Sequence, residues 1–218
     1  MKRKYNWPSH IFNFLAVILG VYLGFYINER AKIGQDKKES VALMNSLVSD
    51  LSGDIKIYNN FEIPENREQM QNIERLLGLL QTDSIDAISS QLATVFQVEN
   101  CAPSTSTYSS MKASGKLGLI DNLALQKKLS DYYEGIAIES VKKGEFQVEY
   151  FTSQLLPWLT NNVDLIEMRV LNENELVPLR NKLIIYLSLI DQKLNSYQML
   201  VDDSEKVKQK IEAVLESK

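Results

Sequence analysis

An unbroken apolar run near the start of the chain is its clearest hydropathy pattern. From Ile11 to Ile27 the sequence is apolar on every side of a helix, with Asn13 as its one strongly polar residue. This is about the shortest run that crosses the hydrocarbon layer of a bilayer as a helix, and Ser9, His10 and Asn28 extend it into the interface. The pattern predicts a transmembrane anchor over residues 11–28, and the lipid bilayer is therefore the first expected partner.

Two other kinds of segment produce a similar run. A secretory signal peptide has a shorter apolar region and a small-residue cleavage site, whereas this run continues into Phe25-Tyr26-Ile27-Asn28-Glu29-Arg30. A buried helix of a soluble core would be amphipathic or capped at its ends. An uncleaved anchor fits the sequence better than either alternative.

Beyond the anchor, apolar residues recur in alternating steps of three and four, which is typical of long helices packed nearly parallel. The pattern predicts long helices over residues 28–58, 65–81, 121–156 and 173–216. We expect Asn59-Asn60 and Pro64 to end the first of these helices, and Pro157 to interrupt the third. Asp121 is the expected N-terminal cap of the third.

Shorter apolar patterns around residues 85–96 and 108–115 predict two accessory helices. No stretch alternates strictly over the length of a strand. The expected fold class is all-α: one N-terminal transmembrane helix continuing into a bundle of long helices with short accessory helices. The expected domains are a basic tail (1–10), the anchor (11–28) and one helical domain (29–218).

The amino-acid composition argues against several kinds of functional site. Cys101 is the single cysteine and His10 the single histidine, so an internal disulfide, a cysteine-based zinc site and a Ser-His-Asp or Cys-His hydrolase are not expected. The net charge is −4 and lysines and arginines are spread among acids, which argues against a nucleic-acid partner. We expect no cofactor and no metal, while carboxylate and lysine chemistry stays formally open.

The charges beside the anchor bear on its orientation. Lys2, Arg3 and Lys4 precede it, and a mixture of basic and acidic residues follows it. Basic residues favour the cytoplasmic side, and long domains translocate largely regardless of charge. We therefore expect a bacterial inner-membrane protein with a cytoplasmic N-terminus and a periplasmic bulk; the reverse orientation is the alternative.

One face of the anchor carries small residues. Ala16, Gly20 and Gly24 recur every fourth residue, and Asn13 lies on roughly the same face. Small residues at this spacing let a second helix approach closely, in the same protein or in another. The alternative is that glycine is simply frequent in membrane helices.

A second group of candidate residues lies in the middle of the chain. Ser114-Gly115-Lys116-Leu117-Gly118 superficially resembles a phosphate-binding loop, but its glycine spacing is too short and its context is helical. Tyr108, Gly115, Gly118, Tyr132 and Tyr133 are the expected border of a pocket or partner surface. The alternative is that Gly115 only stops a helix and that the tyrosines pack in the core.

Two stretches together resemble a known family. The first is the apolar segment leading into Tyr26-Ile27-Asn28-Glu29-Arg30 and the run 47–51, and the second is the run 106–120 leading to Tyr132-Tyr133. They resemble an uncharacterised bacterial family of single-pass membrane proteins with an Ile-Asn-Asn-Trp-Asn-like motif after the helix. Glu29 and Arg30 stand where that family has Asn-Trp. The resemblance implies an anchor and a helical extracytoplasmic domain, and it implies no activity.

These patterns favour a non-catalytic interaction protein of the bacterial envelope. Its partners would be other membrane or envelope proteins, or further copies of itself. The alternative is a helical bundle that senses a small ligand and signals through a partner protein. An enzyme is the least favoured class, because no set of residues points to a reaction.

Overall fold

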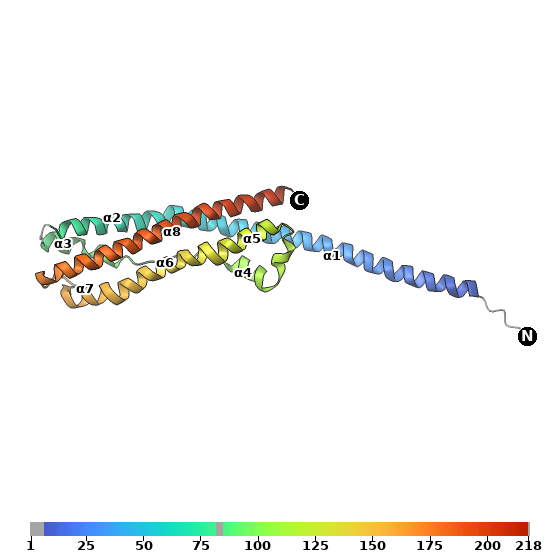
Figure 1. The fold of residues 1–218 in the computed structure, drawn as a ribbon, viewed down its shortest axis with the longest axis horizontal. Coiled ribbons are helices and arrows are strands. Elements are labelled where there is room, and N and C mark those ends of the chain that lie inside the picture. The colour runs from blue at the N-terminus through green and yellow to red at the C-terminus, as the bar shows by residue number, and fades with distance from the viewer. Residues whose placement is uncertain (1–6, 82–84, 218) are drawn as a thin grey trace, which may run out of the picture.

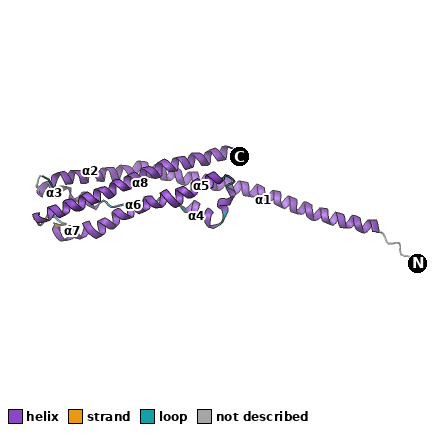
Figure 2. Ribbon diagram, in the orientation of Figure 1, coloured by secondary structure: helices purple, strands orange, loops and turns teal. Residues whose placement is uncertain are grey.

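The computed structural model describes residues 7–81 and 85–217, and most of these residues are helical (Figures 1 and 2). Three long helical rods lie side by side, and the first continues far beyond the bundle towards the N-terminus (Figure 1). The all-α class and the continuation of the N-terminal helix into the bundle are confirmed. Most of the tail predicted for residues 1–10 lies outside the described residues.

The first rod is one continuous helix. It consists of α1 (Trp7–Ile57), a π-helical turn (Tyr58–Glu62) and α2 (Ile63–Leu79). In the turn, the amide of Ile63 donates to the carbonyl of Tyr58, one residue further back than in an α-helix. The end predicted at Asn59-Asn60 and Pro64 is therefore wrong.

The extra residue of this turn keeps one face of the rod buried. Buried positions follow steps of three and four up to Tyr58, take one step of five to Ile63, and then return to steps of three and four. Pro64 is the second residue of α2, two positions after the turn ends at Glu62. In a regular helix its ring would collide with the carbonyl four residues back, and the wider π-turn relieves that collision.

The second rod also contains π-turns between its α-helices. It consists of α5 (Leu123–Asp131), a π-turn (Tyr132–Ile136), α6 (Ala137–Tyr150), a further π-turn (Phe151–Leu155) and α7 (Leu156–Asn162). The interruption predicted at Pro157 is wrong, because this proline also follows a π-turn and the rod stays helical to Asn162. Asn122, rather than the predicted Asp121, caps the rod by accepting from the Leu125 amide at 2.9 Å.

The third rod is α8 (Leu176–Glu216), which follows a short 3₁₀ turn (Glu173–Glu175). A small antiparallel hairpin, β1 (Val163–Asp164) and β2 (Arg169–Val170), connects it to the second rod. The sequence predicted no strand, because two residues are too few to show alternation. The accessory elements are α3 (Ile85–Gln91), α4 (Ser106–Ala113) and 3₁₀ turns at Leu92–Phe96 and Lys116–Leu119.

The third rod is the centre of the bundle. It packs against α1 and α2 along one side and against α6 along the other. One buried cluster, which includes Met44 and Leu51 of α1, fills the half nearer the N-terminal helix. A second cluster, which includes Leu179 and Leu183 of α8, fills the far half, and Leu194 contacts both.

The apolar N-terminal segment does not contribute to this core. Every residue from Ile11 to Gln35 is exposed, and the first buried residue is Ser40. Among the described residues this is the one helix long and apolar enough to cross a membrane. Burial of these side chains therefore requires something outside the chain.

The π-turn of the first rod leads to a prediction about stability. Deletion of Asn60, an exposed residue of the turn, reduces the five-residue step to four and leaves Pro64 inside a regular helix. We expect this deletion to lower the free energy of unfolding by about 3 kcal/mol. Denaturant titration of the full chain in detergent, followed by circular dichroism, measures it.

The matched variant combines the Asn60 deletion with Pro64→Ala. It should recover most of the lost stability, because a regular α-helix then spans the site and both flanking segments keep their buried faces. If the combined variant is as unstable as the deletion alone, the proline is not the reason for the π-turn.

Candidate functional site

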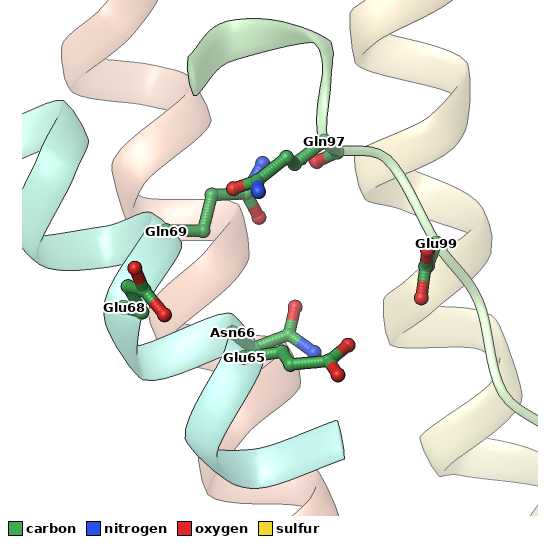
Figure 3. A pocket seen from close by; sticks show the side chains of 6 residues that line it. All are labelled: Glu65, Asn66, Glu68, Gln69, Gln97 and Glu99. Atoms are coloured by element: carbon green, nitrogen blue, oxygen red, sulfur yellow. The ribbon is translucent and has the colours of Figure 1, made fainter. Parts of the chain in front are cut away.

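An extended segment, residues 97–104, lies between the first and second rods and over the third. We call it the strap. Figure 3 shows it passing between α2 and α6, with α8 behind. It has no strand partner, so its backbone polar groups need other partners wherever they face the bundle.

Side chains from the rods supply those partners. Gln69 donates to the carbonyl of Gln97, Lys193 to that of Glu99 at 3.0 Å and Tyr58 to that of Cys101 at 3.1 Å. In the other direction, the Cys101 amide donates to the Tyr197 hydroxyl at 3.2 Å, and the Ser104 amide donates to the Asp54 carboxylate at 3.0 Å. The first and third rods thus bond the strap through their side chains. The second rod bonds it through its backbone, because the Asn100 side chain donates to the Val141 carbonyl at 3.4 Å.

A buried amide network joins all three rods beside the strap. Gln147 of α6 donates to Gln69 of α2 at 3.2 Å and to the Tyr186 hydroxyl of α8 at 3.0 Å. All three side chains are almost completely buried. The side-chain amide oxygen of Gln147 (Oε1) has no hydrogen-bond partner among the described residues. The hydrogen-bonding capacity of the network is therefore not fully used.

Lys193 is the least expected member of this region. Its side chain is 0% exposed, and its ammonium group lies 5.9 Å from the centre of the Tyr197 ring. Burial lowers the pKa of Lys193 to about 8, although the nearby charges of Glu62 and Glu99 favour the protonated form. Such a lysine is costly in a core and is retained only where it has partners.

A small polar cavity opens beside the strap. Its volume is about 90 Å³, which is room for a few water molecules. Figure 3 shows the side chains that line it: Glu65, Asn66, Glu68, Gln69, Gln97 and Glu99. No group of three or more His, Cys, Asp or Glu residues in the described part of the chain is placed to hold a metal ion.

Cys101 lies in the strap and is partly buried. Burial, followed by the charge of Glu62, raises the pKa of its thiol. The thiolate, which is the nucleophilic form, is therefore disfavoured.

The sequence-predicted tyrosines do meet, but in the core. The ring of Tyr133 stacks on Tyr108 at 4.5 Å and meets Tyr132 edge-on at 4.8 Å. The Tyr132 hydroxyl accepts from Ser204 at 2.8 Å, and burial raises the pKa of Tyr132 to about 12. Tyr108 donates to Glu134, which also pairs with Lys112 at 2.6 Å.

Of these residues, Tyr133 borders an open groove. The groove has a volume of about 310 Å³ and lies between Pro103 of the strap and Ile138 and Val141 of α6. Gly115 has φ +73°, a left-handed conformation that suits glycine, and it ends α4. Gly118 lies in the following 3₁₀ turn, and neither glycine lines this groove.

The predicted face of the N-terminal helix is open. Asn13, Ala16, Gly20 and Gly24 are all exposed, and apart from the neighbouring helix backbone no described atom lies within 4 Å of a Cβ added at either glycine. A second helix could therefore approach this face closely.

The structure defines the chain as an all-α bundle, and residues 7–81 and 85–217 include one helix long and apolar enough to cross a membrane. No family model, no curated protein and no solved structure matches it.

The strap contacts were not predicted from the sequence. One signal was present: Gln69, Tyr186 and Lys193 interrupt the centre of otherwise apolar stripes. A charged or polar residue at such a position indicates a specific buried partner.

The lowered pKa of Lys193 predicts a pH effect on stability. Above pH 8 the folded lysine releases its proton, while the unfolded lysine keeps it up to its ordinary pKa of 10.5. The unfolded state then binds more protons, so stability rises with pH. In a Cys101→Ser chain, which removes the opposing thiol, we expect the free energy of unfolding to rise by about 1–2 kcal/mol between pH 8 and 9.5.

The same titration on the Cys101→Ser, Lys193→Met chain is the control, and the rise should be absent from it. The buried tyrosines, whose pKa values are raised, lower stability as the pH approaches 10, but they do so equally in both chains, so the difference between the two chains measures Lys193. Equal slopes in the two chains would mean that Lys193 keeps its proton when folded.

Proposed function

We propose that this chain is a membrane-anchored helical interaction protein of the bacterial envelope, non-catalytic, that binds other protein chains or further copies of itself. The observation that carries the proposal is the continuous helix from Trp7 to Leu79. It joins the exposed apolar segment to the bundle without a loop. A bundle mounted in this way has a constant height and direction, which suits contact with partners in or beside the same membrane.

Helix geometry gives the distance between the apolar segment and the bundle. Between the apolar segment, which ends at Ile27, and the first buried residue, Ser40, the helix is exposed except for Asp36 and Glu39, which are partly buried. At 1.5 Å per residue this stretch lifts the bundle about 18 Å from the apolar segment. The bundle then stands clear of the headgroups and its sides are accessible.

Orientation is part of the proposal. The basic residues Lys2, Arg3 and Lys4 favour a cytoplasmic N-terminus, which leaves the bundle in the periplasm. The Ala16-Gly20-Gly24 face provides a surface for a second membrane helix, from another copy or from a different protein.

Thiol labelling tests this orientation. In a Cys101→Ser background, Asn181→Cys places a thiol at an exposed position of α8. A membrane-impermeant maleimide should label it in cells whose outer membrane alone is permeable. Asn6→Cys, at the other end, should react only after the inner membrane is broken. The opposite pattern would reverse the orientation and move the bundle to the cytoplasm.

Association tests the interaction role. After extraction with a mild detergent, the complex should have a protein mass above that of one chain, measured by light scattering corrected for detergent. Gly20→Leu with Gly24→Leu fills the small-residue face and should lower this mass if that face makes the contact, whereas Val17→Leu with Val21→Leu should not. A strictly monomeric chain with no co-extracted protein contradicts the proposal.

A further inference from the structure

The turn of the β1–β2 hairpin exposes large apolar side chains. The hairpin tip, defined here as residues 165–168, lies in the connection between α7 and α8, at the end of the bundle opposite the N-terminal helix (Figure 1). Ile166 is 95% exposed and Leu165 46%. Turns are normally built from glycine, proline, asparagine, aspartate and serine. Packing within this chain does not account for an isoleucine in full contact with water.

The tip is also held in one shape. The Asp164 carboxylate accepts from the amides of Ile166 at 2.9 Å and Glu167 at 3.1 Å, and these bonds lower the pKa of Asp164. Met168 has φ +51°, which costs a residue other than glycine about 1 kcal/mol. Its side chain packs against the far core cluster, which stabilises this conformation. A preorganised apolar turn loses little entropy when it binds.

The surroundings of the tip are acidic. Asp164 and Glu167 lie beside and in the turn, and Glu173 and Glu175 follow the hairpin in the sequence. Arg169 is the one basic residue of this stretch, and it pairs with Glu167 at 3.3 Å. Two further apolar side chains, Leu171 and Val177, are more than half exposed nearby. The stretch 164–177 thus combines exposed apolar side chains with an excess of acidic over basic residues.

This charge selects among possible occupants. An anionic lipid surface would repel the carboxylates. Copies anchored in one membrane hold their tips at the same height, so a tip would meet the same end of a second copy, and like charges would then face each other. A surface with an apolar pocket and a basic rim complements the tip in both respects.

We propose that the hairpin tip is a docking surface for a different protein that offers an apolar pocket rimmed by lysine and arginine. The inference rests on the proposed interaction function and names the surface and the chemistry of its partner. Ile166 fills the pocket, and Glu167 and Glu173 face the basic rim.

Site-specific photocrosslinking in native membranes tests this. The full chain carries p-benzoylphenylalanine at position 166 or, as a matched control, at Leu123, which is 76% exposed at the start of α5 near the other end of the bundle. We expect position 166 to form an adduct with a second protein and position 123 not to form it. Peptide mapping should place the linked site in an apolar pocket beside basic residues.

A charge-reversed chain, Glu167→Lys with Glu173→Lys, should give about tenfold less adduct at position 166. Unchanged thermal melting shows that this chain remains folded. An adduct with a second copy or with lipid, or a yield that is unaffected by charge reversal, overturns the proposal.

The two proposals fail differently. If position 166 stays unlinked while the extracted complex still exceeds the mass of one chain, the tip is not the docking surface and the interaction function stands. If no adduct forms at either position and the extracted chain is monomeric, both are wrong.

Discussion

The strap imposes the constraint on which the arrangement of the bundle depends. A segment without secondary structure lies between two helical rods, and its inward carbonyls and amides need partners there. Asp54, Gln69 and Lys193 are the helix residues that meet this need most directly. They explain why polar side chains occupy the centre of otherwise apolar stripes. The cost is a lysine buried with a lowered pKa and an amide network with one unpaired oxygen.

A second constraint is register. Long rods can bury one face along their whole length only if every insertion is absorbed locally. The π-turns do this, and in the first rod the turn takes the buried face from Tyr58 to Ile63 without rotating the residues beyond it. Pro64 and Pro157 each lie two positions after the end of a π-turn, as the second residue of the helix that follows it. Residues that break most helices are therefore compatible with continuous rods here.

The continuous first rod also fixes how the bundle is oriented relative to the proposed membrane anchor. The first rod leaves the core at Ser40 and carries the exposed apolar segment at its other end. Because no loop intervenes, the far end of the bundle has a defined direction relative to that segment. The hairpin tip lies at this far end and is itself fixed by Asp164 and Met168. The chain thus places a preformed apolar surface at a set distance from the proposed anchor.

The sequence by itself determined the class of fold, the apolar N-terminal segment and the helical character of most of the chain, because helical periodicity and hydropathy are local signals. The limits at Asn59-Asn60, Pro64 and Pro157 were predicted wrongly, since local rules cannot tell a helix end from a π-turn held by its neighbours. Only the tertiary structure decided that Lys193 is buried and that residues 97–104 run between the rods. The physical reason is that these polar groups find their partners far away along the chain, for example Lys193 at Glu99.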